Sequence, residues 1–193
     1  MKIMIVSITG TPGTGKTTIA RLLQEKNIPV IDLKEVAINK GFIESHDTKR
    51  DSIIIDIKAI NQFIVDTYQS NNVVVIEGLV SHFLECIDEV IVFRCHPRVL
   101  KKRLMNRGWA WKKIKENLEA EMLDVILCES IEQQGMNKIH EIDTSNISIE
   151  NTIEAVYHKI LGDKSKFVVK PGSIDWSELI FDETIMEREE HGS

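Results

Sequence analysis

The residues best suited to chemistry form one glycine-rich segment near the start of the chain. Residues 10–17 read GTPGTGKT and fill every fixed position of the pattern G-x-x-x-x-G-K-[ST]. Glycines let such a loop turn tightly enough for its backbone N–H groups to point at phosphate oxygens. Lys16 supplies a positive charge, and the hydroxyl of Thr17 is a ligand suited to Mg²⁺. The segment therefore predicts a binding site for the polyphosphate of a nucleoside triphosphate.

An acidic residue closes an apolar run further along the chain. The run 73–76 ends in Glu77 and is followed by Gly78. A carboxylate at a strand end can reach a Mg²⁺ ion or orient a water or an acceptor, although ordinary strands also end in carboxylates. His82 lies just beyond, but a lone histidine without ligand spacing is more often structural. We expect Glu77 to serve the metal together with Thr17.

Positive charge is concentrated between residues 98 and 115, where eight lysines and arginines occur with no acidic residue among them. Arg107 is the best candidate for a phosphate contact, because Gly108 permits a bend beside it and a guanidinium offers two parallel donors. For most of the lysines, a solvated face of two helices is an equally good interpretation. Trp109 and Trp111 flank the bend, where we expect packing anchors more than base stacking. The segment suits a lid over a triphosphate.

Size and composition limit what surrounds these residues. A chain of 193 residues can form one α/β domain with a core and a tail. Its net charge of −6 argues against a general nucleic-acid coat. The three cysteines are far apart and outside any C-x-x-C pattern, so we expect no disulfide framework, no zinc site and a cytoplasmic location. No stretch approaches the length of a membrane span, so we expect no membrane partner.

Short apolar runs alternate with helical patterns over most of the chain. Strands are expected at 3–8, 28–32, 73–77, 89–94 and 138–142. Helices are expected to begin near residues 17, 57, 97, 111 and 148, and the one from 111 is expected to run to about 134. Strands that alternate with helices predict an α/β fold with a parallel sheet covered on both faces.

The glycine-rich loop, the strand that ends at Glu77 and the run Arg94, Arg103, Arg107-Gly108-Trp109 together resemble the small nucleoside monophosphate kinases. Within that group the chain is most similar to the adenylate kinase isoenzyme 6 family in its archaeal form. The similarity extends over nearly the whole chain and includes the tail segment KPGSIDWS at 170–177.

This resemblance implies a P-loop nucleoside monophosphate kinase-like three-layer α/β sandwich with a five-stranded parallel sheet. A kinase domain would cover residues 1–162, with a monophosphate-binding segment at about 32–55 and a lid at about 106–116. Residues 163–193 would form a C-terminal tail, either mobile or docked.

The resemblance also implies ATP and Mg²⁺ as cofactors. It gives catalytic roles to Lys16, Glu77 and Arg107, and it places Thr17 and Glu77 at the metal. The implied ATP contacts are Gly10, Gly13, Thr14, Gly15, Lys16, Thr17, Thr18, Arg107 and Asn146, the last at the adenine edge. Members combine adenylate kinase and ATPase activity and assist maturation of the small ribosomal subunit. The implied partners are therefore AMP or another nucleoside monophosphate, a basic small-subunit ribosomal protein and small-subunit rRNA.

Two positions depart from the family pattern. Leu79 stands where the family has a histidine, and Ile38 stands where it has an arginine. An aliphatic side chain cannot pair with phosphate, so efficient phosphorylation of AMP would need another cation. The candidates are Lys34, Lys40, Lys49 and Arg50. Two alternatives stay open: an ATPase assembly factor with little monophosphate kinase activity, and a cytidylate-type small-molecule kinase.

Overall fold

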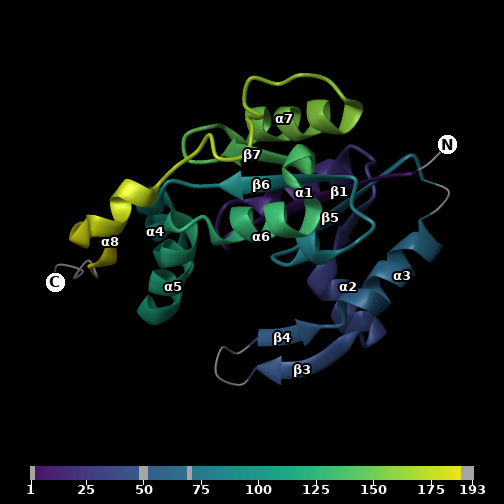
Figure 1. The fold of residues 1–193 in the computed structure, drawn as a ribbon, viewed down its shortest axis with the longest axis horizontal. Helices are drawn as coiled ribbons and strands as arrows, with labels where there is room; N and C mark the ends of the chain where they lie inside the picture. Colours follow the sequence, from purple (N-terminus) through teal and green to yellow (C-terminus); the bar gives the residue numbers. More distant parts are fainter. Residues whose placement is uncertain (1–2, 48–51, 69–70, 188–193) are drawn as a thin grey trace.

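Five parallel strands form the central sheet of the protein, in the order β2-β5-β1-β6-β7 (Figure 1). The structure is a computed structural model, and it describes residues 3–47, 52–68 and 71–187. The strands are β1 (Met4–Gly10), β2 (Val30–Asp32), β5 (Val73–Glu77), β6 (Glu89–Arg94) and β7 (Ile139–Asp143). The expected α/β fold with a five-stranded parallel sheet is confirmed.

Helices cover the sheet and form one end of the molecule. They are α1 (Lys16–Glu25), α2 (Leu33–Lys40), α3 (Ile57–Thr67), α4 (Pro97–Asn106), α5 (Trp111–Met122), α6 (Val125–Gln134), α7 (Ile149–Leu161) and α8 (Glu183–Met186). Three 3₁₀ turns accompany them: η1 (Ser81–Phe83), η2 (Met136–Lys138) and η3 (Ser177–Phe181). Every helix in the described ranges is too short or too polar to cross a lipid bilayer.

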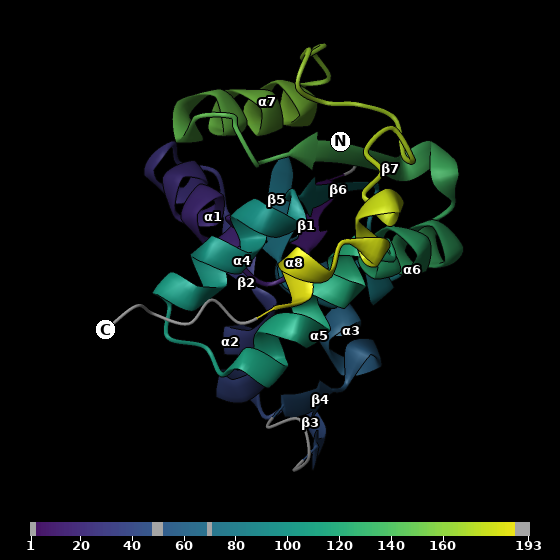
Figure 2. The same cartoon turned by 90° about the vertical axis from the view of Figure 1, so that its left-hand side faces the viewer.

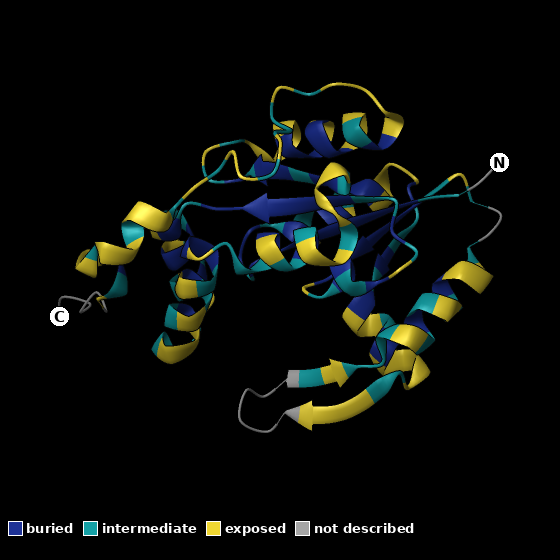
Figure 3. Cartoon of the chain, viewed as in Figure 1, coloured by how far each residue is buried: buried dark blue, intermediate teal, exposed yellow. Residues whose placement is uncertain are grey.

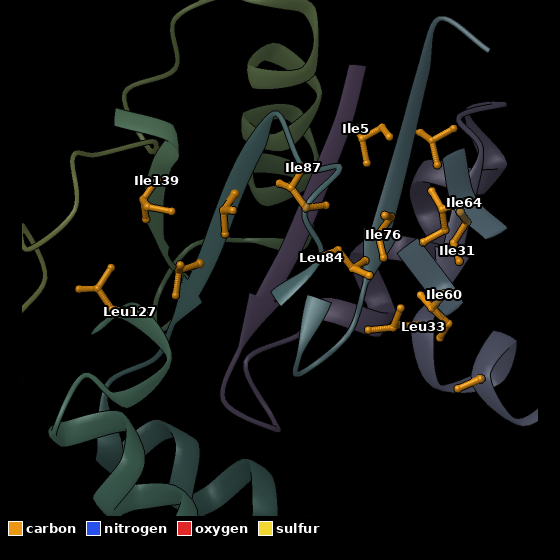
Figure 4. Packing of buried hydrophobic residues seen from close by; sticks show 14 residues of the cluster. Ile5, Ile31, Leu33, Ile60, Ile64, Ile76, Leu84, Ile87, Leu127 and Ile139 are labelled. Carbon is orange, nitrogen blue, oxygen red and sulfur yellow. The ribbon is translucent and has the colours of Figure 1, made fainter. Parts of the chain in front are cut away.

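Two apolar clusters lie on opposite faces of the sheet, and Figure 3 shows the main strands as the most buried part of the chain. On one face, Leu33 of α2 and Ile60 and Ile64 of α3 belong to one cluster, and Leu127 of α6 lies at the other end of it (Figure 4). On the other face, α1 and α7 supply the cover. Because successive strand residues point to opposite faces, β5 sends Val74 and Ile76 to one cluster and Val75 to the other.

The parallel arrangement gathers the functional loops at one edge. Parallel strands end at the same edge of their sheet, so the loops after β1, β2, β5, β6 and β7 are neighbours there. Asp32 at the end of β2 lies directly opposite Glu77 at the end of β5. Asp32 also accepts a hydrogen bond from the backbone N–H of Glu35 and so caps α2.

The prediction of a single helix over residues 111–134 is wrong. The structure has two helices, α5 and α6, separated at Leu123 and Asp124. Asp124 has φ 54°, a left-handed conformation that ends the first helix, and its carboxylate pairs with Arg94 of β6. An apolar period runs through the break, which is why the sequence pattern did not show it.

The segment expected to bind a monophosphate consists of α2 and a hairpin. Its strands are β3 (Ile43–Asp47) and β4 (Ser52–Ile55), and they form a sheet of their own. The hairpin extends away from the main sheet below α2 and α3 (Figure 1), with largely exposed or half-buried residues (Figure 3). Lys49 and Arg50 lie outside the described residues.

The described part of the tail is docked. Val169 pairs with Glu141 of β7 as an isolated antiparallel bridge. The chain then crosses to α4 and α5, where η3 and α8 lie beside them (Figure 2). Ile185 of α8 is fully buried in a third apolar cluster with Leu100, Leu118 and other residues of α4 and α5. Arg98 donates to the Asp182 carboxylate at 2.5 Å across the same contact.

Candidate functional site

The glycine-rich loop joins β1 to α1 in backbone conformations that require glycine. Gly10 has φ 136°, and a Cβ there would lie 2.3 Å from the carbonyl oxygen of Phe93 on β6. Gly15 has φ 103° and begins α1 in a left-handed conformation, with open space where a Cβ would project. The loop leads directly into the first turn of α1, and the free backbone N–H groups of a first helical turn are suited to bind an anion.

Lys16 folds back over the loop. Its Nζ donates to the carbonyl oxygen of Gly10 at 2.6 Å and to that of Thr11 at 3.2 Å, and its side chain is buried. Burial lowers the pKa of Lys16 to about 8, while the carboxylates of Glu77 and Glu121 act in the opposite direction. The geometry places a positive charge inside the loop, close to where phosphate oxygens would sit.

Thr17 and Glu77 form a pair suited to a divalent cation. The Thr17 hydroxyl lies 3.5 Å from Glu77 Oε1. The pKa of Glu77 is raised above its ordinary value, mainly by burial and further by Asp32. The charge of Lys16 and the hydrogen bond from Thr17 act in the opposite direction. Mg²⁺ prefers oxygen ligands and is usually held by one or two carboxylates together with phosphate oxygens and water. The oxygen donors present here fit that ion.

A cavity of about 210 Å³ adjoins the loop. One wall is the loop and the start of α1, a second is the β7–α7 connection with Ile147 and Ile149, and a third carries Arg103 and Arg107. Of the residues predicted to contact ATP, the cavity wall contains Gly13, Thr14, Gly15, Thr18 and Arg107. Residues far apart in the sequence are thus brought together at the carboxyl edge of the sheet.

Arg103 is a candidate that was not among the predicted site residues. Its Nη2 donates to the carbonyl oxygen of Thr144 at 2.6 Å, and its Nη1 lies 3.2 Å from the Thr144 hydroxyl. These bonds hold the guanidinium against the β7–α7 connection in the cavity wall. Arg103 lies in the last turn of α4, four residues before Arg107, which follows that helix. This four-residue spacing is the signal that could have identified the pair.

Asn146 lies in the wall of a second cavity, of about 340 Å³, which the tail residues Lys166 and Phe167 also line. Ile147 contributes to both cavities. The predicted place of Asn146 at the adenine edge therefore has no contact in the first cavity to support it and stays a prediction.

His82 belongs to the core and not to the cavity. Its side chain is fully buried, its Nδ1 lies 3.2 Å from the Thr9 hydroxyl, and its ring packs on Phe83. Burial lowers the pKa of His82 to about 4. The carboxylate of Glu129 lies 3.5 Å from Nε2, but it is 41% exposed, so the effect of burial prevails. His82 is therefore a neutral packing residue.

The side of the site near α2 carries exposed apolar residues. Ile38 is 50% exposed and Leu79 is 45% exposed. Lys34 and Lys40 are exposed on α2, and Lys40 Nζ lies 5.1 Å from the centre of the Phe63 ring. Neither lysine lines a described cavity.

Comparisons with known proteins agree with this architecture. A family model described as an AAA domain matches residues 6–124. A protein of Methanocaldococcus jannaschii named "Putative adenylate kinase" is 38% identical over 185 residues, covering 95% of this chain and 99% of the relative. A protein of the same name from Archaeoglobus fulgidus is 43% identical over 178 residues, covering 91% and 94%.

Solved structures give the same fold. The shikimate kinase of Bacteroides thetaiotaomicron matches with a TM-score of 0.53 at 18% identity, covering 82% of this chain and 98% of that chain. At this identity the likeness shows the fold alone. The identities and coverage of the archaeal relatives show more: this chain belongs to the family of archaeal proteins that carry the adenylate kinase name, with an AAA domain over residues 6–124.

Proposed function

We propose that this protein is an ATP-dependent nucleoside monophosphate kinase that transfers the γ-phosphoryl group of ATP to AMP or a similar acceptor. The observation that carries the proposal is that Lys16 and the Thr17–Glu77 pair lie at the phosphate loop, and that this loop shares a cavity wall with Arg107. The adenylate kinase name of relatives that match over nearly the whole chain supports the same activity.

Phosphoryl transfer asks a protein mainly for positioning and positive charge. The loop N–H groups would bind the β- and γ-phosphates, with Lys16 as the charge nearest the transferred group. Mg²⁺ when bound neutralises charge on the phosphate oxygens, and Thr17 and Glu77 are the residues that would hold it.

The lid residues would complete the site from the opposite side. Arg107 follows α4 in an exposed turn beside Gly108, so its guanidinium can approach the phosphates without rearranging the core. A bidentate guanidinium there would stabilise charge shared between donor and acceptor oxygens. We assign the lid to residues 106–116 and the acceptor segment to 32–55, within a kinase domain of residues 1–162 and beside the tail 163–193.

A coupled assay with a panel of nucleoside monophosphates tests the proposal. Formation of ADP that depends on AMP, CMP, UMP or GMP is expected, and Lys16→Ala should abolish it. The acceptor with the highest kcat/KM separates an adenylate kinase from a cytidylate-type enzyme. ADP formation no faster than that of Lys16→Ala with every acceptor would refute the kinase assignment.

ATP hydrolysis is the second candidate activity. Ile38 and Leu79 are about half exposed at the acceptor side, where relatives of the isoenzyme 6 type have residues that can contact phosphate. Apolar side chains there would leave an acceptor phosphate poorly bound, so that water could act as acceptor. Release of phosphate from ATP without any monophosphate measures this activity directly.

A role in small-subunit maturation follows from the resemblance and from tail chemistry. Glu178, Glu183 and Glu187 are exposed on the described tail, and such carboxylates suit a basic ribosomal protein. Small-subunit rRNA is a proposed partner on the resemblance alone. Pull-down from cell extract with ATP or with ADP tests this role. Partner sets without ribosomal components in both nucleotide states would contradict it.

A further inference from the structure

Glu121 is a buried carboxylate whose two oxygens connect three parts of the protein. It lies on α5 and is 2% exposed. Its Oε1 accepts from Arg94 Nε at 2.9 Å and from the backbone N–H of Cys95 at 3.0 Å. Its Oε2 accepts a hydrogen bond from the hydroxyl of Thr11 in the phosphate loop. One side chain thus joins α5, the end of β6 and the loop.

Thr11 is the residue on which the internal bonds of the loop converge. Its carbonyl oxygen accepts from Lys16 Nζ at 3.2 Å, from the Thr14 backbone N–H at 3.3 Å and from the Thr14 hydroxyl at 2.9 Å. The Thr11 side chain is 1% exposed, so its hydroxyl faces the protein and not the cavity. A bond that fixes this side chain also fixes the peptide group that orients Lys16 and Thr14.

Arg94 holds Glu121 in place. Burial disfavours its charge, but the carboxylates of Glu121 and Asp124 raise its pKa above the ordinary value. Its guanidinium also donates to Glu141 at 2.6 Å and to the carbonyl oxygen of Ile174 in the tail at 3.3 Å. A buried carboxylate with both oxygens satisfied has little freedom to move, which suits a fixed support.

From this geometry we propose that Glu121 is a positioning residue that holds the phosphate loop in its binding conformation through Thr11, with Arg94 as its anchor. The inference rests on the proposed ATP site and extends it to a residue that does not touch the nucleotide. A charge-assisted hydrogen bond in a buried site is among the stronger single contacts in a protein, so its loss should change the order of the loop measurably.

A double-mutant cycle tests the link. Thr11→Val removes the hydroxyl with little change in shape, and Glu121→Gln removes the charge. Each should weaken ATP·Mg binding, measured by calorimetry, by on the order of tenfold. Both changes remove the charge-assisted contact between Thr11 and the carboxylate, so the double variant should be no weaker than the weaker of the two single variants. Thr11→Ser keeps the hydroxyl and should restore affinity.

Asp124→Asn is the matched control. Asp124 pairs with Arg94 as Glu121 does, but no contact joins it to the loop among the described hydrogen bonds. The affinity of the Asp124→Asn variant for ATP should lie within about threefold of the wild-type affinity. Three outcomes would each overturn the proposal. They are an equal loss of ATP affinity in Asp124→Asn, losses that multiply in the double variant, and wild-type ATP affinity in folded Glu121→Gln.

Hydrogen exchange in nucleotide-free protein separates this inference from the proposed function. The Thr14 N–H donates to the Thr11 carbonyl, so its exchange rate reports the order of the loop. Thr11→Val should raise that rate, and Thr11→Ser should not. If the wild type fails to bind ATP, the proposed function falls while this comparison still decides the role of the Thr11 contact. If Glu121→Gln does not fold, the Thr11 variants carry the test alone, and unchanged exchange in Thr11→Val overturns the proposal.

Discussion

The Thr17 hydroxyl lies 3.5 Å from Glu77 Oε1, although 60 positions separate the two residues in the chain. The contact exists because β1 and β5 are adjacent parallel strands whose carboxyl ends meet at one edge. It joins the start of α1 to the end of β5 beside the phosphate loop. The proposed metal site depends on this relationship.

Replacement of Glu77 should weaken the use of Mg²⁺. Glu77→Gln keeps the size of the side chain but removes the negative charge, so activity should fall about 10- to 100-fold, and more Mg²⁺ should be needed for half-maximal rate. A magnesium titration of the coupled assay measures both effects. Thr17→Ser keeps the hydroxyl and serves as the mild comparison. A Glu77→Gln variant with the wild-type magnesium profile would exclude Glu77 from the metal site.

Replacement of the two cavity arginines should affect different kinetic constants. Arg107→Ala removes the guanidinium expected to stabilise the transferring charge, so kcat should fall by about 10³-fold. Arg103→Ala removes the bonds to Thr144 in the cavity wall and should mainly raise KM for ATP. Steady-state kinetics at varied ATP resolve the two effects. Lys102→Ala, an exposed change on the same helix, should leave both constants near the wild type.

Ile38→Arg should improve the use of AMP. Ile38 is 50% exposed on α2 at the acceptor side, so a longer charged side chain can be accommodated without disturbing the core. A guanidinium there would pair with the acceptor phosphate, and KM for AMP should fall by about tenfold. Leu161→Arg makes the same charge change at a residue 59% exposed at the end of α7 and should have no such effect. Equal gains in the two variants would point to net charge instead of a local contact.

His82 should make the folded protein sensitive to acid. Its pKa is about 4 in the folded state against 6.5 ordinarily, so the folded protein binds fewer protons than the unfolded chain. The stability linked to neutral His82 is complete above pH 6.5 and is lost as the pH falls towards 4, by about 3 kcal/mol in total. Denaturant unfolding of wild type and His82→Gln from pH 8 to pH 4 measures it. The free energy of unfolding should change less steeply with pH in the variant than in the wild type. An equal pH dependence in both proteins would exclude a buried neutral His82.

Ile185 should hold the tail on α4 and α5. It is fully buried in the cluster with α4 and α5, so Ile185→Ala should weaken docking by about 2–4 kcal/mol. Limited proteolysis should then cut the tail faster than in the wild type. Ile180→Ala, at a position 39% exposed on η3, is the control. Similar cleavage rates in all three proteins would show that the tail does not depend on this contact.

The sheet could be predicted from the sequence because its strands are buried on both faces. Such strands appear as unbroken apolar runs, and the expected 73–77 and 89–94 match β5 and β6. The phosphate loop was recognisable because its chemistry needs fixed residues at fixed spacing. Local rules of this kind leave a signal in a short window of sequence.

Contacts between distant residues left no such signal. The break between α5 and α6 depends on Asp124 meeting Arg94 of β6, and the apolar period continues through it. The spacing between Arg103 and Arg107 did not show that Arg103 lies in the cavity wall, because that placement depends on Thr144 after β7. Glu121 has the sequence pattern of an ordinary helix carboxylate, and only the fold brings it to Thr11.

Binding of ATP in the presence of Mg²⁺ is the measurement closest to the central claim. Isothermal calorimetry of the wild type should give a saturable transition with one nucleotide per chain, and Lys16→Ala should weaken it by at least tenfold, since Lys16 Nζ lies within the loop. Circular dichroism of both proteins shows that each is folded. A folded wild-type protein that releases or absorbs no binding heat at millimolar ATP and Mg²⁺, and that does not compete for a fluorescent ATP analogue, would contradict the account.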